Sequence, residues 1–357
     1  MYLFYLIIIY ILFSGYLYEI LTKTNTSKKI LLFSTFGLFF ILSGFRASNI
    51  GNDTVSYLNV FTNLLEPGGF ERAMWRYETG YLLLNKVSAL ISTNPQIILI
   101  VSSGIVMLFF AKFIYRYSEI PWLSVFLFVT LGFFPATMNI IRMSLAFSII
   151  LWAFKFLNEK KLLPFIFVVI LASTFHRTSI VFLSAWLFRD TKINTKLTLS
   201  VLSSGLFLFL IWPLLLSLII NIFPLFSYYL EGQYMKGGIR LASILNLLVS
   251  FVILLIGLLY KDRIKDSRQN QLMLLLILIG TSISIVALRF NLLERVATVF
   301  IMFSIAFLPN LIKSLSNKKN IIILYSAVIV FFFIFRTIIF IYRPNWNTIF
   351  PYSFFWQ

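Results

Sequence analysis

Arginines lie at the ends of several long apolar runs, where a charged side chain is costly to bury. Arg46 lies in "GFRASNIGNDTVSYLNVF", Arg142 in "FFPATMNIIRMSLAF", and Arg289 and Arg295 in "RFNLLER". The planar guanidinium holds phosphate or carboxylate through two hydrogen bonds at once, whereas lysine acts as a point charge. For any one of these arginines, the alternative is snorkelling or pairing with a nearby acid. Snorkelling is the better explanation for Arg336 and Arg343. Taken together, the first four predict a shared anion-binding cavity.

The chain has one histidine, His176, beside Arg177 in "STFHRTS". A lone histidine is commonly structural, and that alternative stays open. An imidazole is also a natural general base for a sugar hydroxyl. Asp53 is a candidate helix N-cap, sugar ligand or base. We predict His176, Asp53 and Arg142 as the catalytic residues, with Glu78 or Asp53 as the base if His176 is not.

The remaining polar residues near these segments are predicted to bind substrate. They are Arg46, Tyr57, Glu78, Asn139, Arg177, Arg289 and Arg295. The chain lacks cysteine and its acids are scattered, so we expect no metal ion and no cofactor. Sequence signatures of nucleotide, metalloprotease and serine hydrolase sites are absent. An enzyme of this composition would neutralise charge with arginine and use a single proton acceptor.

The segments that must position these residues are apolar. The 357-residue chain is 60% hydrophobic and 12% charged, and runs able to cross a ~30 Å hydrocarbon core recur throughout. The net charge of +18 comes largely from short basic loops that resemble orientation signals, so we do not expect nucleic acid as a partner. The first run lacks a basic leader and is predicted to be a retained helix. The sequence predicts an all-α polytopic integral membrane protein, with 1–357 as a single membrane-embedded domain.

The basic loops predict the topology. Placing all of them on the cytoplasmic side satisfies the positive-inside rule and requires an even number of crossings between consecutive loops. About twelve transmembrane or re-entrant helices result, with both termini outside and an outward-facing polar cavity. The loops are residues 23–29, 112–116, 155–161, 189–196, 261–268 and 313–319.

Three segments are predicted to lie outside: 46–94, which should carry an amphipathic helix at the headgroup level, the loop 221–240 and the tail 343–357. The interval 162–188 is too short for two full crossings, and a single crossing would invert every later basic loop. We therefore expect a re-entrant or broken helix pair there. Its break, at 175–179, should line the polar cavity.

The order and spacing of these segments resemble the EpsG branch of the Wzy-type polymerases, which act in capsule, exopolysaccharide and O-antigen synthesis. The resemblance extends over nearly the whole chain and includes "YETGYLLLNKV", "LRFNLLERVATVF" and "NWNTIFPYSFFW". It implies a multi-pass enzyme of the bacterial cytoplasmic membrane that joins oligosaccharide repeat units carried on undecaprenyl pyrophosphate at the outer face. It also implies a flippase and a chain-length regulator as partners. The residues that match the family's recurrent polar positions are Arg46, Asp53, Tyr57, Asn139, Arg142, His176 and Arg289.

Three other activities remain open. A flippase for the same lipid-linked glycan would face both sides in turn and usually shows internal repeats, which the sequence lacks. A membrane O-acyltransferase also uses a lone histidine and arginines, but its polar groups gather at the inner face or mid-membrane. A polysaccharide ligase performs nearly the same chemistry as a polymerase, and the sequence separates the two poorly.

Overall fold

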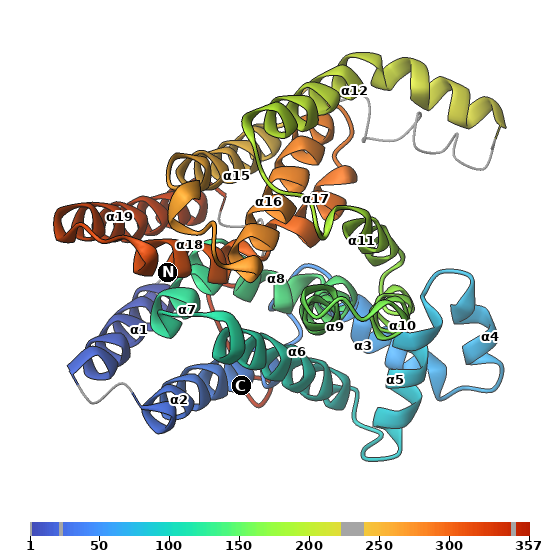
Figure 1. Ribbon diagram of the computed structural model, residues 1–357. Coiled ribbons are helices and arrows are strands. Elements are labelled where there is room, and N and C mark those ends of the chain that lie inside the picture. Colours follow the sequence, from blue (N-terminus) through green and yellow to red (C-terminus); the bar gives the residue numbers. More distant parts are fainter. Residues whose placement is uncertain (1, 21–23, 223–238, 344–347) are drawn as a thin grey trace. The chain divides into compact units, whose positions relative to one another are not determined.

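The computed structural model describes residues 2–20, 24–222, 239–343 and 348–357 (Figure 1). Most of the predicted 221–240 loop therefore lies outside the described residues. The chain folds into two compact units. The first comprises Met1–Phe156, Leu163–Ile180 and Leu315–Gln357, and the second comprises Leu157–Leu162 and Val181–Ser314.

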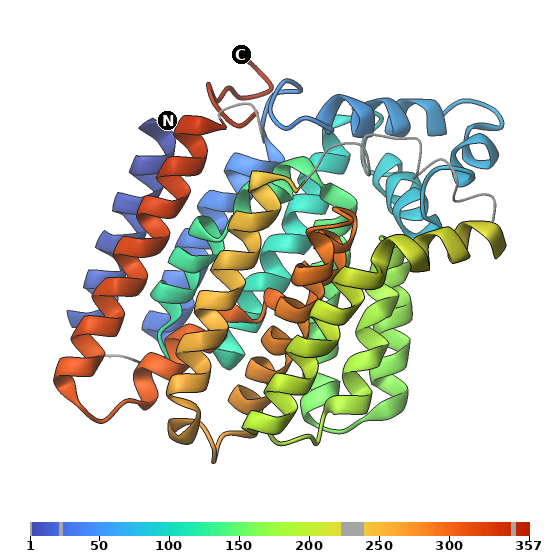
Figure 2. The ribbon, with the colours of Figure 1, turned by 90° about the horizontal axis from the view of Figure 1, so that it is seen from above.

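The first unit is a bundle of long apolar helices joined by shorter ones. α1 (Tyr2–Ile20) and α19 (Lys318–Tyr342) run side by side in opposite directions (Figure 2). Between them the ring centres of Phe4 and Phe340 lie 4.8 Å apart. α2 packs along α6. The helices are α1 (Tyr2–Ile20), α2 (Asn25–Gly44), α3 (Thr54–Leu64), α4 (Gly69–Met74), α5 (Thr79–Ala89), α6 (Gln96–Tyr117), α7 (Pro121–Thr130), α8 (Phe133–Asn139), α9 (Ile141–Asn158), α10 (Leu162–Ser173) and α19 (Lys318–Tyr342).

Local sequence explains several helix starts in this unit. The Thr24 hydroxyl accepts a hydrogen bond from the Ser27 amide at 3.1 Å, which forms a capping box at the start of α2. Pro121 occupies the first turn of α7, where its missing N–H has no intrahelical partner to lose. Asn317 caps α19 by accepting a hydrogen bond from the Lys319 amide.

The second unit is organised around α16, whose side chains are largely buried. α12, α15, α17 and α18 all pack against it, and the Ser282 hydroxyl of α16 donates to the Val201 carbonyl of α12 at 2.7 Å. The 3₁₀ helix η1 (Arg177–Ser184) begins in the first unit and ends in the second. The other elements are α11 (Ala185–Phe188), α12 (Thr195–Ile222), α15 (Leu241–Leu259), η3 (Lys261–Arg263), α16 (Arg268–Ala287), α17 (Leu293–Ile301) and α18 (Ser304–Ser314).

The predicted all-α membrane architecture is confirmed. Within the described ranges, nine helical segments are long and apolar enough to span a membrane, and α7 with α8, bent by 51°, forms a tenth if the pair is one span. The expected count of about twelve is not confirmed, because the two apolar helices Leu162–Ser173 and Arg177–Phe188 are short. Twelve α-helical residues rise only about 18 Å, well under the ~30 Å hydrocarbon core.

The 46–94 segment contains three short helices, α3, α4 and α5, of 11, 6 and 11 residues. α3 and α5 pack against each other, and α4 contacts both. The Lys86 ammonium of α5 lies 4.2 Å from the centre of the Phe70 ring of α4. The position of this segment relative to a membrane stays a prediction.

Candidate functional site

Glu78 stands at the centre of a charged cluster in the first unit. Its carboxylate accepts a hydrogen bond from the Arg142 guanidinium, and its Oε1 lies 3.6 Å from Nδ1 of His176. The same oxygen accepts a hydrogen bond from the backbone N–H of Arg177 at 3.3 Å. The side chains of Glu78 and His176 are each only 10% exposed. Glu78, Arg142, His176 and Arg177 are called the Glu78 cluster below.

Breaks between helices bring the cluster together. Glu78 immediately precedes α5, Arg142 follows the break between α8 and α9, and His176 lies between α10 and η1. The Gly80 amide donates to the Thr174 carbonyl at 2.9 Å. A Cβ on Gly80 would lie 2.2 Å from the Thr174 hydroxyl oxygen, so only glycine lets the "YETGY" segment dock on the end of α10.

The cluster keeps Glu78 ionised. Burial alone would favour the neutral acid, but the adjacent His176 imidazole and the Arg142 charge outweigh it and lower the pKa of Glu78 to about 2. A carboxylate with so low a pKa is a poor proton acceptor. The low pKa therefore speaks against Glu78 as the base.

Several buried polar atoms near the cluster have no hydrogen-bond partner within the described part of the chain. They are both ring nitrogens of His176, Nε of Arg142, and the hydroxyls of Thr178 and Ser179. Native proteins leave few buried polar groups unpaired, and those that remain often mark functional sites. The hydroxyls and phosphate oxygens of a substrate are chemically suited to pair with these atoms.

Tyrosines line one side of the cluster. The Arg142 guanidinium lies 4.9 Å from the centre of the Tyr77 ring, and the Tyr57 and Tyr81 rings are 5.7 Å apart. Burial raises the pKa of both Tyr57 and Tyr81, so their hydroxyls stay protonated and able to donate. Tyr77 and Tyr81 are absent from the set predicted from the sequence, although their positions beside Glu78 in "YETGY" could have indicated them.

Two further predicted residues lie near this region. Asp53 is exposed at the N-cap position of α3, where its side chain makes no capping bond within the described chain. Its charge contributes to the raised pKa of Tyr57. Asn139 is buried at the end of α8, three positions before Arg142.

Arg46 has a different environment. It is fully buried and donates to three backbone carbonyls, those of Ser43, Ile50 and Met138, and to the Thr54 hydroxyl. Burial lowers the pKa of Arg46 to about 10, which still leaves it a cation at neutral pH. Because its donors are engaged by carbonyls, Arg46 has a structural role, which speaks against the predicted substrate contact.

The described part of the tail, 348–357, packs on the loop that contains Arg46. The Ala47 amide donates to the Ser353 carbonyl, and the Phe355 amide donates to the Phe45 carbonyl, both at 3.0 Å. The tail segment quoted in the family resemblance and the loop that contains Arg46, far apart in the chain, therefore meet in the first unit.

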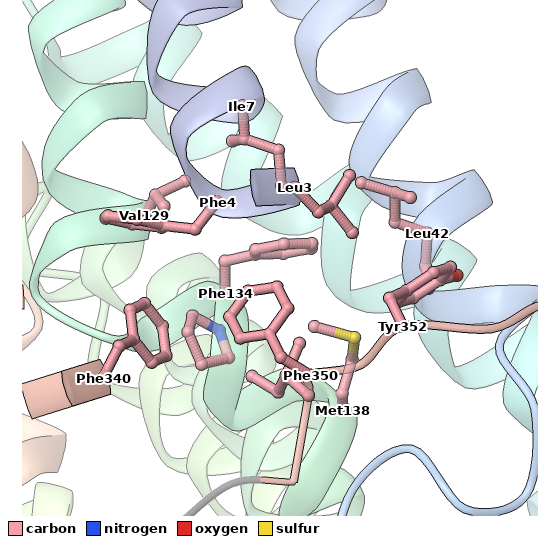
Figure 3. Close-up of a pocket in the computed structure, with 12 residues that line it drawn as sticks. Leu3, Phe4, Ile7, Leu42, Val129, Phe134, Met138, Phe340, Phe350 and Tyr352 are labelled. Atoms are coloured by element: carbon pink, nitrogen blue, oxygen red, sulfur yellow. The ribbon is translucent and has the colours of Figure 1, made fainter. Parts of the chain in front are cut away.

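An apolar pocket lies next to this junction (Figure 3). Its lining includes Phe4 of α1, Phe134 and Met138 of α8, and Phe350 and Tyr352 of the tail. Aromatic and aliphatic side chains of this kind stabilise by packing. Packing among these side chains therefore holds the tail against α8.

Arg336 corrects the expectation of snorkelling. It is buried at 6% exposure within α19, and its Nε donates to the Thr130 carbonyl at 2.9 Å. Thr130 is the last residue of α7, so Arg336 satisfies a carbonyl at the bend between α7 and α8. The Arg336 guanidinium therefore binds a buried carbonyl and does not extend toward the lipid headgroups.

Arg289 and Arg295 belong to the second unit, and both are exposed. The Arg289 guanidinium lies 4.8 Å from the centre of the Phe209 ring. Glu294, between the two arginines, accepts a hydrogen bond from the Ser243 hydroxyl. The cavity predicted for four arginines combines residues of both units and stays a prediction.

A model of the EpsG family matches residues 29–354, a range that includes the whole Glu78 cluster. The chain belongs to the EpsG family. Membership in the EpsG family supports a polysaccharide polymerase-type role, and the apolar helices indicate a multi-pass membrane protein. No curated protein and no solved structure matches the chain.

Proposed function

We propose that this EpsG family member is a polysaccharide polymerase of the bacterial cytoplasmic membrane. It joins oligosaccharide repeat units carried on undecaprenyl pyrophosphate at the outer face. The observation that carries the proposal is the Glu78 cluster, in which one carboxylate contacts Arg142, Arg177 and a buried imidazole that has no hydrogen-bond partner among the described residues. Membership in the EpsG family supports the choice of a polymerase as the class of enzyme.

The reaction is a glycosyl transfer. The acceptor hydroxyl on the incoming unit loses its proton to Nε2 of His176, and its oxygen attacks the anomeric carbon of the sugar attached to pyrophosphate. The bond between that carbon and the pyrophosphate oxygen breaks, and undecaprenyl pyrophosphate leaves with the electron pair. Attack opposite the leaving group inverts the anomeric carbon.

Each residue of the cluster has a role in this step. The ionised Glu78, whose Oε1 lies 3.6 Å from Nδ1, favours the imidazole tautomer with its proton on Nδ1 and leaves Nε2 to accept the proton. The Nε–H of Arg142, which has no partner in the described part of the chain, and the exposed Arg177 guanidinium stabilise negative charge as it develops on pyrophosphate. Glu78 thus positions two partners, a more specific role than the substrate contact expected from the sequence.

Gel analysis of lipid-linked glycans tests the proposal in a host that lacks the chromosomal copy. We expect Arg142→Ala and His176→Ala to lower polymer formation by roughly 10²-fold or more, because general bases and charge-stabilising donors each contribute on that scale. Single lipid-linked repeat units should accumulate. Arg72→Ala is the matched control, because Arg72 is an exposed arginine paired with Glu66.

The same gel separates the rival activities. Finished polymer that stays unattached would identify a ligase, and full-length polymer without acyl groups would identify an O-acyltransferase. Loss of lipid-linked units from the outer face would identify a flippase. Normal polymer in both variants, at normal protein levels, would refute the assigned roles of Arg142 and His176.

A separate flippase and a chain-length regulator are the partners we propose for the polymerase.

A further inference from the structure

A basic groove lies at the opposite end of α9 from the Glu78 cluster. It is a cavity of about 590 Å³ in the first unit, between the C-terminal ends of α6 and α9. The two helices meet there through aromatic pairs, with Phe109 and Trp152 ring centres 6.0 Å apart. The residues that line the groove are Phe109, Lys112, Phe113, Tyr115, Arg116, Tyr117, Leu151, Trp152 and Lys155.

Every charged residue in that lining is basic. Lys112 and Arg116 are exposed one turn apart on α6, and the half-buried Lys155 faces the same cavity from α9. This set places one guanidinium and two ammonium groups, three positive charges in all, at one cavity. Glu119, three residues after Arg116, is outside the lining. The groove is therefore complementary to an anion.

Apolar side chains continue from the basic end along the helices. Leu108, one turn before Lys112, is 52% exposed, and Trp152, one turn before Lys155, is 39% exposed. Tryptophan and tyrosine are enriched where a membrane protein crosses the headgroup region. A ligand that carries both phosphate and hydrocarbon fits this surface better than free phosphate does.

The groove is separate from the Glu78 cluster. Arg142 and Lys155 are thirteen residues apart on α9, which corresponds to about 20 Å along the helix. The positive-inside rule places the loops at 112–116 and 155–161 on the cytoplasmic side. The ligand of this groove therefore comes from the leaflet opposite the proposed polymerase site.

We propose that the groove binds an anionic glycerophospholipid of the inner leaflet, such as phosphatidylglycerol. Its phosphate lies among Lys112, Arg116 and Lys155, and its acyl chains run along Leu108 and Trp152. Basic pockets between transmembrane helices on the cytoplasmic side are suited to anionic headgroups. The bound lipid would hold the ends of α6 and α9 together.

Native mass spectrometry of the purified full chain tests this proposal. The protein is titrated with phosphatidylglycerol and with phosphatidylcholine of the same acyl chains. We expect a preference for phosphatidylglycerol that falls on the order of 100-fold in Lys112→Gln/Arg116→Gln/Lys155→Gln, since each surface cation contributes about fivefold. Lys29→Gln/Lys192→Gln/Lys318→Gln removes the same charge from exposed positions in other basic loops and should keep the preference.

Single variants keep the test informative if the triple variant folds poorly. Lys155→Gln should lose part of the preference for phosphatidylglycerol over phosphatidylcholine. Lys155→Arg, which keeps the positive charge, should retain this preference. Brominated phosphatidylglycerol should quench less tryptophan fluorescence in Trp152→Phe than in the parent protein. An unchanged preference in the triple variant, an equal loss in the control, or displacement of the lipid by millimolar inorganic phosphate would overturn the proposal.

Discussion

At the scale of single residues, the buried Arg46 and the half-buried Arg142 differ in what they face. Arg46 faces backbone carbonyls, whereas Arg142 faces a carboxylate and has an Nε–H with no partner in the described chain. A guanidinium that already satisfies carbonyls stabilises a loop. A guanidinium held by one carboxylate is preorganised and still has a donor for a ligand.

Arg46→Lys should therefore lower stability first and activity only as a consequence. Lysine cannot reach three carbonyls in different directions, and each buried acceptor left unpaired costs about 1–3 kcal/mol. We expect a lower thermal midpoint in detergent, with Arg72→Lys as the exposed control. Unchanged stability together with loss of polymer would make Arg46 a substrate ligand after all.

Glu78→Gln should change the pH dependence of stability. The pKa of Glu78 is lowered from 4.5 to about 2 in the folded protein, so its stabilisation is complete above pH 4.5 and is lost as the pH falls toward 2. The shift corresponds to stabilisation on the order of 3 kcal/mol. The difference in thermal midpoint between parent and variant should be constant above about pH 5 and shrink below it. A difference that does not vary between pH 5 and pH 2.5 would contradict the assigned ionisation.

At the scale of elements, the site depends on the contact between the start of α5 and the end of α10. Gly80→Ala should separate them, because its Cβ would collide with Thr174. We expect reduced polymer formation and a lower thermal midpoint. Gly37→Ala is the matched control, since a Cβ at Gly37 meets nothing within 4 Å and alanine favours the helix. Equal behaviour of the two variants would show that the contact is dispensable.

Much of the architecture is readable from the sequence, because apolar run length and basic loops depend on local composition alone. The sequence assigns Arg142, His176 and Glu78 to one site, but it does not predict that the Glu78 carboxylate contacts both of the other side chains. Burial of Arg46 and Arg336 could not be predicted, since it depends on carbonyls at Met138 and Thr130 that are distant in the chain. Hydrophobic periodicity predicts individual helices, but it does not predict which helix ends, distant in the sequence, will contact each other.

At the scale of the whole molecule, the short interval 162–188 decides the topology. Ten spans keep all predicted basic loops on one side only if this interval crosses the membrane twice or not at all, because a single crossing would invert every later loop. Its two short helices, Leu162–Ser173 and Arg177–Phe188, suit a re-entrant or broken pair.

The chain has no cysteine, so single cysteines introduced into it report their side without background. Lys29→Cys, Lys192→Cys and Lys318→Cys should react with a membrane-impermeant maleimide only after the cells are opened, whereas Thr62→Cys should react in intact cells. Lys29 precedes the 162–188 interval and the other two lysines follow it, so the comparison shows whether that interval crosses the membrane an odd or an even number of times. Labelling of Lys192→Cys and Lys318→Cys in intact cells, with Lys29→Cys still protected, would show that the interval crosses once. The second unit would then be inverted relative to the basic-loop prediction, and Arg289 and Arg295 would lie on the side opposite the proposed polymerase site.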